Sequence, residues 1–446
     1  MNPYLEAIPK LLGWDEFFAN LRSLPPIPYD LERMSASDRR MQLAALTGFF
    51  YPMKYMYVIY DMLHRAITTT YSTKTTLDSI RQINALHQGS QTGHFQHRIY
   101  SISADSSSIL GVPGIGKTST VKRCLDLLPQ VIEHTEYNGE PFYTKQISHL
   151  MVECPSDCSV KALVFNIAMA IDRAIGSEYF DRMAKIRSMS ASVLANQIKI
   201  ICMNHHVGLI VIDEIQNAVT TAERNHQMKP LIRFLVELTN DTNTSVCFVG
   251  TPIAEDLFCS QEHLKRRTRG LRLLPLKPGG AYREFLSTLW VYQYTAHNIE
   301  LADSLANRLY DYSAGIPAYI VKLFMEAQAQ AIMDGSERIN AGILKQTVER
   351  LAIRVPKVFS GGTYISDFTV SENPVDFPVE SHSERPVCPQ EVSEEKVVAP
   401  RPYAVPRGRR RVVRESADLI ELFKKAKAAD EMVKAIERLE LREDGA

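Results

Sequence analysis

The stretch "SSSILGVPGIGKTSTVKRCL", residues 106–125, joins a short apolar run, a loop with three glycines and the start of a helical pattern. Within it, Gly111, Gly116, Lys117 and Thr118 fit the spacing G-x-x-x-x-G-K-[ST], which is the P-loop pattern. Glycines let backbone N–H groups close around phosphate oxygens, and the positive N-terminal end of the following helix adds to the attraction. The stretch therefore predicts a buried strand, a phosphate-binding loop and a helix, in that order.

The residues of this loop have separate expected roles. Lys117 is predicted to reach the β- and γ-phosphates and to act in catalysis, and the Thr118 hydroxyl is predicted to hold Mg²⁺. ATP and Mg²⁺ are therefore the expected cofactors. The full set of predicted nucleotide-binding residues is Gly111, Val112, Pro113, Gly114, Ile115, Gly116, Lys117, Thr118 and Ser119.

A second segment, "HHVGLIVIDEIQNAV" at residues 205–219, supports this interpretation. Its apolar run, residues 209–212, predicts a buried parallel strand, and Asp213 and Glu214 follow directly. Two carboxylates at the end of such a strand suit Mg²⁺-dependent hydrolysis of a nucleoside triphosphate. We expect Asp213 to support the Mg²⁺ and its waters, and Glu214 to polarise the water that attacks the γ-phosphate.

The remaining pattern predicts an α/β fold. "HLMVECP" (149–155) and "TSVCFVGTP" (244–252) are predicted strands, and helical patterns lie between the strands, which indicates a parallel sheet covered on both faces. Thr251, at the end of the later strand, is the candidate for a catalytic residue that senses the γ-phosphate; a plain turn is the alternative. From 281 to about 350 the pattern is wholly helical and predicts a small lid beside the nucleotide.

A basic cluster follows this strand, within "EHLKRRTRGLRLLPLKPGG". One interpretation is an arginine that reaches the γ-phosphate held by a neighbouring protomer, where its charge stabilises the transition state. Arg266 and Arg267 are the first candidates for this catalytic role, and Arg269 is the third. A solvated basic surface and a DNA-facing surface are the alternatives. The cluster consists of Lys265, Arg266, Arg267, Arg269 and Arg272.

Composition sets the outer limits. The chain has 446 residues, 45% hydrophobic and 23% charged, with a formal net charge of zero. It is thus globular, and attraction to nucleic acid must come from local basic patches. Because no long apolar run is present and the seven cysteines are scattered, we expect a cytoplasmic protein without a membrane contact.

Pattern and composition divide the chain into five parts. The first is a helical extension that either packs on the core or docks a partner. After the lid, a proline- and acid-rich linker, expected to be disordered, ends in a run of six arginines that suits phosphate backbones or a solvated tail. The last part is a helix with one apolar face, which needs something to pack against. The expected bounds are 1–85 for the extension, 86–276 for the nucleotide-binding core, 277–354 for the lid, 355–414 for the linker and 415–446 for the last helix.

With these motifs in place, the chain resembles the AAA+ ATPases, through "GVPGIGKT", "LIVIDEIQ", "FVGTP" and the helical lid. A narrower resemblance is to the TnsC/TniB type, which regulates DNA transposition. It rests on "NPYLEAIP", "VECPSDCSVKALVFNIAMAID", "IDEIQN" and "SAGIPAYIVKLFMEAQAQAI". Together these segments run from residue 2 to about 350.

The resemblance implies an ATPase that assembles as rings or filaments on double-stranded DNA when ATP is bound. It implies further copies of the chain, a target-selector protein and transposase subunits as partners, and places the transposase contact in the C-terminal tail. Hydrolysis would serve as a switch or a disassembly step. One position departs from the AAA+ pattern: "GIPAYIVK" has Ala318 where many members carry an arginine, so that contact is missing or is supplied by Lys322. A replication initiator or helicase loader, and a signalling or scaffold ATPase without DNA binding, are the alternative functions.

Overall fold

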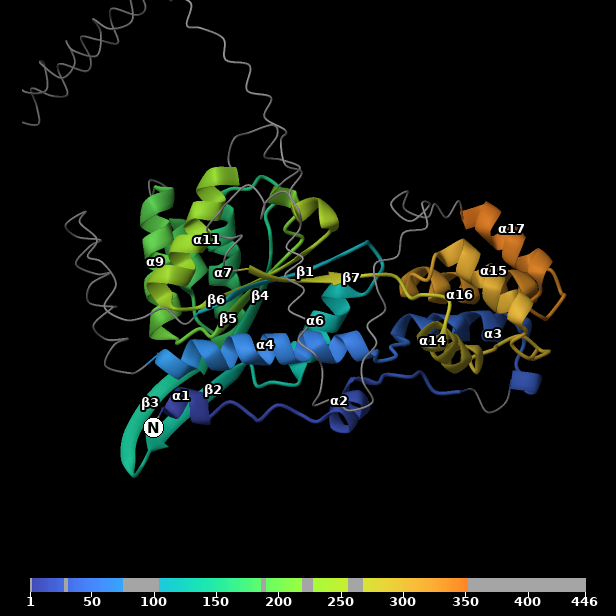
Figure 1. The fold of residues 1–446 in the computed structure, drawn as a ribbon, viewed down its shortest axis with the longest axis horizontal. Helices are drawn as coiled ribbons and strands as arrows, with labels where there is room; N and C mark the ends of the chain where they lie inside the picture. Colours follow the sequence, from blue (N-terminus) through green and yellow to red (C-terminus); the bar gives the residue numbers. More distant parts are fainter. Residues whose placement is uncertain are drawn as a thin grey trace, which may run out of the picture. The chain divides into compact units, whose positions relative to one another are not determined.

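The computed structural model describes six segments of the chain, all within one compact unit, Met1–Cys388 (Figure 1). The basic residues Lys265, Arg266 and Arg267, the proline-rich linker, the arginine run and the last helix lie outside the described residues. The described segments are 2–27, 31–74, 104–185, 190–218, 228–255 and 268–351.

The centre of the core is a five-stranded parallel sheet with the order β4-β5-β6-β1-β7. Every residue of β1, β5 and β6 is buried, as the apolar runs in these segments require. The predicted α/β fold is confirmed. The strands are β1 (Ser106–Gly111), β4 (His149–Glu153), β5 (Leu209–Asp213), β6 (Ser245–Gly250) and β7 (Thr268–Leu273).

The edge strand β7 was not expected. Its segment, "TRGLRL", carries Arg269 and Arg272 and appeared in the sequence as part of a basic surface. In the structure it pairs in parallel with β1, with Thr268 opposite Ser106. An edge strand has one unpaired side and tolerates charged side chains. The arginines therefore hide the alternation of apolar and polar residues that would predict a strand.

Helices cover both faces of the sheet, as predicted (Figure 1). Successive side chains of β5 point to opposite faces of the sheet. Leu209 and Val211 therefore belong to one buried cluster, and Ile210 and Ile212 belong to the other. The cluster with Leu209 includes α4 (Lys54–Thr73) and α6 (Lys117–Asp126). The opposite cluster includes α7 (Val160–Ile175), α8 (Tyr179–Lys185), α9 (Ala191–Asn204) and α11 (Met228–Thr242).

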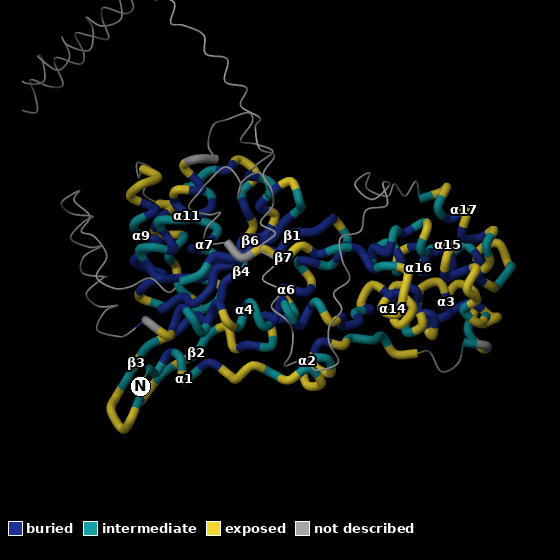
Figure 2. The backbone as a smooth tube through the Cα atoms, in the orientation of Figure 1, coloured by how far each residue is buried: buried dark blue, intermediate teal, exposed yellow. Residues whose placement is uncertain are grey.

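A β-hairpin lies between α6 and β4 and was also missing from the sequence-based expectations. It is formed by β2 (Val131–Tyr137) and β3 (Glu140–Ile147), which pair in an antiparallel ladder. Asn138 and Gly139 join the strands with positive φ angles of 54° and 84°, the combination that an Asn-Gly hairpin turn uses. The tip of the hairpin is exposed, whereas β1, β5 and β6 of the main sheet are buried (Figure 2).

The predicted lid is present as a helical bundle. Its α14 and α16 pack through Trp290 and Phe324, whose ring centroids lie 5.1 Å apart. Gln328, fully buried on α16, accepts a hydrogen bond from the Tyr294 backbone and donates one to the Tyr292 carbonyl. The lid helices are α14 (Gly280–Trp290), α15 (Asp303–Ser313), α16 (Pro317–Met333) and α17 (Ala341–Leu351).

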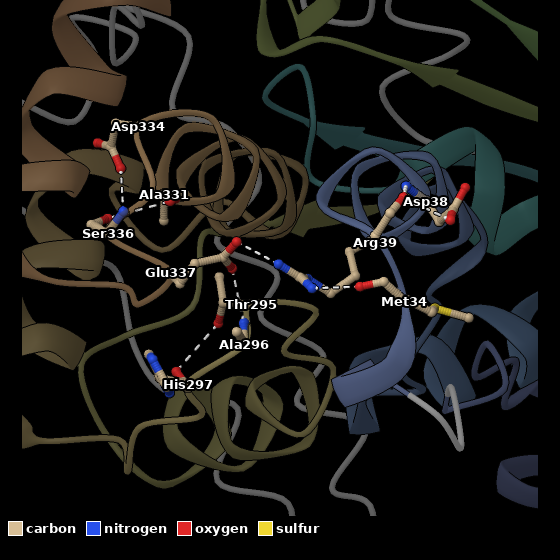
Figure 3. Close-up of polar contacts among 11 residues, drawn as sticks. Met34, Asp38, Arg39, Thr295, Ala296, His297, Ala331, Asp334, Ser336 and Glu337 are labelled. Atoms are coloured by element: carbon tan, nitrogen blue, oxygen red, sulfur yellow. Dashed lines mark hydrogen bonds and ion pairs between the residues drawn. The ribbon is translucent and has the colours of Figure 1, made fainter.

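The N-terminal extension contacts both the core and the lid. Arg39 on α3 donates to the Met34 carbonyl over 2.8 Å and forms an ion pair with Glu337 of the lid (Figure 3). The second carboxylate oxygen of Glu337 accepts the Ala296 backbone N–H over 3.0 Å. The extension consists of α1 (Pro3–Glu6), α2 (Trp14–Leu21), η1 (Leu31–Arg33), α3 (Ala36–Gln42), η2 (Leu43–Gly48) and α4.

None of the helices in the described part of the chain is both long and apolar enough to cross a membrane.

Candidate nucleotide-binding site

The predicted phosphate-binding loop lies between the end of β1 and the start of α6. Gly114 and Gly116 have φ angles of 83° and 97°, in the region that favours glycine. Gly116 is the residue before the first helical position, Lys117, so the N-terminal end of α6 faces the loop. Of the predicted binding residues, Val112 and Ile115 are buried in the core, whereas Pro113 and Ser119 are exposed.

The Lys117 side chain folds into the loop. Its Nζ donates to the Gly111 carbonyl over 2.8 Å and to the Val112 carbonyl over 3.1 Å. Burial lowers the pKa of this lysine, and the nearby carboxylates of Glu214 and Asp213 act in the opposite direction. The ammonium is therefore held at the base of the loop by carbonyl oxygens that phosphate oxygens can replace.

The two predicted Mg²⁺ ligands are in direct contact. The Thr118 hydroxyl donates to Asp213 Oδ2 over 2.7 Å, although the residues come from α6 and β5. Asp213 is buried, and its Oδ1 accepts the Glu214 backbone N–H over 2.8 Å. A hydroxyl and a carboxylate that converge in this way are hard oxygen donors, so they fit a magnesium ion that also binds phosphate oxygens.

Glu214 begins a tight turn after β5. Its φ angle is 55°, which is uncommon for a residue with a side chain, and the residue is exposed. The turn is fixed by two backbone hydrogen bonds, from Ile215 N to the Val249 carbonyl over 3.0 Å and from Asn217 N to the Glu214 carbonyl over 2.9 Å. Backbone strain of this kind is frequent at functional sites.

Gln216 is the residue of this site that sequence reasoning missed. Its Nε2 donates to Glu214 Oε2, and its Oε1 accepts the Thr251 backbone N–H over 3.0 Å. The structure thus brings Thr251 to Glu214, the residue predicted to orient water. Thr251 Oγ1 is buried and has no hydrogen-bond partner among the described residues. The motif "DEIQN" contained Gln216, but its spacing alone does not reveal a contact with a residue of another strand.

The lid meets the phosphate loop at the start of α16. The Ala318 backbone N–H donates to the Gly114 carbonyl over 3.2 Å. A Cβ on Gly114 would lie 3.2 Å from Ile316 Cγ2 and 3.3 Å from the Ala318 Cβ, so a glycine suits this close approach. Ala318 brings no charge to the loop, and Lys322, one turn further along α16, is exposed. A contact between Lys322 and the nucleotide stays a prediction.

The extension also contacts the loop, through Tyr55 of α4. Its hydroxyl donates to the Ile115 carbonyl over 3.3 Å. The phosphate-binding loop is therefore braced by the lid on one side and by the extension on another.

The basic cluster is only partly within the described residues. The Arg269 backbone lies in β7, but its side chain is outside the description, together with Arg266 and Arg267. Arg272 forms a two-pronged ion pair with Glu255, at 2.9 Å and 2.5 Å. The assignment of an arginine that acts on a neighbouring protomer stays a prediction.

A sequence model of the family described as "AAA domain" matches residues 103–258, less than half of the chain. The matched range contains the phosphate loop, Asp213, Glu214, Gln216 and Thr251. The match and the geometry of the loop support a P-loop ATPase domain of the AAA class in this range. No protein of curated function matches the chain in sequence.

Solved structures with a similar arrangement have low sequence identity. The Aeropyrum pernix ORC1 protein in complex with DNA is 14% identical with a TM-score of 0.39, over 62% of this chain and 64% of that chain. The Drosophila ORC bound to DNA is 12% identical with a TM-score of 0.40, over 79% of this chain and 72% of the other. The Thermotoga maritima RuvB Holliday junction branch migration motor is 15% identical with a TM-score of 0.31, over 63% and 70%. The chain thus spans less than two thirds of the ORC1 protein, and similarity of this extent establishes neither function nor partners.

Proposed function

We propose that the protein is an ATP-dependent switch that assembles on double-stranded DNA and regulates transposition. The observation that carries the switch is the connected group at the ends of β1, β5 and β6. In it Thr118 contacts Asp213, and Gln216 joins Glu214 to Thr251. One phosphate site is thereby linked to two strand ends and, through Gly114 and Ala318, to the lid.

The residues of the loop bind ATP in the following way. The N–H groups of the loop and the N-terminal end of α6 surround the phosphates. The Lys117 ammonium exchanges the carbonyls of Gly111 and Val112 for phosphate oxygens, which relieves the cost of its burial. Thr118 and Asp213 would hold a magnesium ion, which would supply positive charge to the phosphates.

Hydrolysis depends on the carboxylate of Glu214, which orients and polarises a water molecule for attack on the γ-phosphate. The Thr251 hydroxyl, buried without a partner among the described residues, supplies a hydrogen-bond donor for the γ-phosphate. Loss of the γ-phosphate removes this contact and releases the strand end and the lid from the closed arrangement. The hydrolysis step thus ends the bound state.

Assembly on DNA and the role in transposition are supported by the TnsC/TniB resemblance of four segments between residues 2 and 350. Under this proposal the nucleotide lies between protomers and an arginine among Arg266, Arg267 and Arg269 completes the neighbour's site. The partners are double-stranded DNA, further copies of the chain, a target selector and transposase subunits. The arginine run at 401–414 supplies positive charge for phosphate backbones.

A replication initiator or helicase loader is the second candidate, because an AAA domain serves such proteins equally well. The two differ in how they choose DNA. A transposition regulator of this type assembles on duplexes of unrelated sequence, whereas an initiator favours the sequence of its origin. A scaffold ATPase that does not bind DNA is the third candidate.

Electron microscopy of negatively stained samples tests the proposal. The full chain is mixed with duplexes of two unrelated sequences, each with a non-hydrolysable ATP analogue, with ADP or without nucleotide. We expect rings or filaments on both duplexes with the ATP analogue alone, and none with Lys117→Ala, which loses ATP binding. Assembly on one duplex only would favour the initiator. Separate protomers in all samples would favour the scaffold ATPase, and normal assembly of Lys117→Ala would contradict the switch.

A further inference from the structure

We propose that Gln216 is a positioning residue that holds the Glu214 carboxylate and the end of β6 in one hydrogen-bonded unit. This inference rests on the proposed ATP hydrolysis and adds a residue to it. Gln216 itself touches neither nucleotide nor water in the proposal. It acts through Glu214 and through the Thr251 backbone.

The Gln216 amide is well suited to this role because it has a donor and an acceptor on one rigid plane. The donor, Nε2, faces Glu214 Oε2, and the acceptor, Oε1, receives the Thr251 N–H over 3.0 Å. The Glu214 carboxylate offers acceptors only, and the Thr251 backbone N–H offers a donor only. An amide satisfies both at once, whereas a carboxylate or a hydrocarbon at residue 216 does not.

The surroundings of the amide fit its close approach to β6. A Cβ on Gly250 would lie 2.6 Å from Gln216 Oε1 and 2.8 Å from Ile215 Cγ2. A side chain at residue 250 would therefore push the amide away. The backbone hydrogen bond from Ile215 to Val249 holds the turn against the same strand, so Gln216 has a fixed base from which to reach Thr251.

Glu214 needs such a support. It is exposed and lies outside the strand, and its φ of 55° places it in a turn. Asp213 Oδ1 accepts the Glu214 backbone N–H, so this contact fixes the backbone of Glu214 and does not orient the Glu214 carboxylate. Orienting a catalytic group before the substrate arrives raises the rate of the chemical step without tightening binding.

The same contacts link the sensor position to the catalytic one. Thr251 donates its backbone N–H to Gln216, and its hydroxyl is available to the γ-phosphate. A displacement of Thr251 upon phosphate contact moves the acceptor of Gln216 and, through the other end of the amide, the Glu214 carboxylate.

The experiment measures kcat, KM and the affinity for a fluorescent ATP analogue in the full chain. For Gln216→Ala we expect kcat to fall about tenfold or more, because the carboxylate loses its orientation, while the affinity changes less than about twofold. Asn217→Ala is the matched control, since it removes an amide from the same turn that donates to the Cys154 carbonyl over 3.1 Å. Its kcat is expected to stay near the wild-type value.

A second variant, Gln216→Glu, separates positioning from general support of the fold. At neutral pH two carboxylates meet, and kcat should fall at least as far as in the alanine variant. The charge at residue 216 repels the Glu214 carboxylate and leaves the Thr251 N–H with an acceptor, so a fall in kcat in this variant locates the effect at the contact with Glu214.

The outcomes also separate this inference from the proposed function. A wild-type protein that binds the analogue but does not hydrolyse ATP would overturn both. If the wild type hydrolyses ATP and Gln216→Ala has equal or higher kcat, only the role of Gln216 is overturned. Parallel losses of affinity and kcat, or a wild-type kcat in Gln216→Glu, would likewise assign Gln216 to the fold alone.

Discussion

The two edges of the parallel sheet treat their polar groups in opposite ways. At the amino edge, the hydroxyls of Thr70, Thr244 and Ser245 are buried and paired, at the starts of β5 and β6. Thr70 of α4 contacts both the Gly208 carbonyl over 2.9 Å and Ser245 Oγ over 2.8 Å. Lys74 and Thr244 both donate to the Val207 carbonyl over 3.0 Å. These contacts fasten α4 to the starts of β5 and β6 and complete the edge without a ligand.

At the carboxyl edge, where the strands end, several polar groups have the arrangement expected of a ligand site. Thr251 Oγ1 is buried without a partner among the described residues, and Glu214 is exposed with a positive φ. Lys117 is buried, and within the described part of the chain its Nζ donates to two carbonyls of its own loop. The paired contacts around Thr70 and the Val207 carbonyl stiffen one edge, and under the proposed function the unpaired groups of the other edge respond to phosphate. The proposed function thus assigns stability and responsiveness to opposite ends of the same strands.

The largest expected effect is at the carboxyl edge, with Glu214→Gln. Loss of the group that polarises water should lower kcat by about 10²–10³-fold, because general-base catalysis contributes that much. ATP binding should persist, since Lys117, Thr118 and Asp213 remain, and complexes on DNA should become long-lived. A phosphate-release assay together with nucleotide titration checks this. Wild-type hydrolysis would assign the water-orienting role to another residue.

Lys74→Met tests how the amino edge contributes to the pH dependence of the free energy of unfolding. Burial lowers the pKa of Lys74 to about 7, against about 10.4 for an unfolded chain. Between these values the unfolded state binds the extra proton, so the free energy of unfolding of the wild type rises with pH. Lys74 should add about 2 kcal/mol between pH 7.5 and 9, and nothing below about pH 6. The Lys74→Met variant lacks this rise.

Urea unfolding at pH 7.5 and 9 measures the effect of Lys74. Thr244 still donates to the Val207 carbonyl in the variant, so no buried acceptor is left unpaired there. Lys199→Met is a control for the loss of a long buried side chain, because Lys199 pairs with Glu237 and Asp241. Equal pH slopes in wild type and Lys74→Met would show that the lysine reaches solvent.

Thr70→Val tests whether the paired edge supplies stability alone. Valine has nearly the same shape but leaves the contacts to Gly208 and Ser245 unmade, so the free energy of unfolding should fall by about 2 kcal/mol. Thr70 lies near the opposite end of α4 from Tyr55, whose hydroxyl contacts the loop, so kcat should stay within about twofold of wild type. Calorimetry and ATPase rates measure the two quantities. A loss of kcat without a loss of stability would contradict the division between edges.

Thr251→Val has the smallest expected effect on stability and completes the comparison. Its hydroxyl is buried without a partner among the described residues, so its removal should leave the free energy of unfolding unchanged or raise it by about 1 kcal/mol. The same change should lower kcat, because the γ-phosphate loses a donor. Thermal unfolding with and without nucleotide checks both. A destabilisation like that of Thr70→Val would place a structural bond at Thr251.

Local patterns predicted the parts of the site that neighbours in sequence create. Glycine spacing located the loop between β1 and α6 that is the candidate phosphate site, and the apolar run before Asp213 and Glu214 identified β5. Gln216 could not be found in this way, because its contact with Thr251 depends on β5 and β6 being adjacent in the sheet. Spacing along the chain does not contain strand order.

Two elements, β7 and the hairpin of β2 and β3, were not predicted from the sequence, for different reasons. The strand β7 hides its pattern because an edge position tolerates arginines. The hairpin did have a signal in Asn138 and Gly139, flanked by residues suited to strands, and an interpretation centred on phosphate motifs overlooked it. The first case is a limit of sequence information, and the second is an omission.

The extension changes what counts as an independent module. The family match begins at residue 103, yet Ile59, Tyr60, Leu63 and Ile67 of α4 lie within the same buried cluster as α6 and the lid. A fragment trimmed to the matched range would expose a face that these side chains normally cover. The range that matches the family model is therefore shorter than the unit expected to fold by itself. A shortened or transplanted ATPase portion should include the first seventy or so residues.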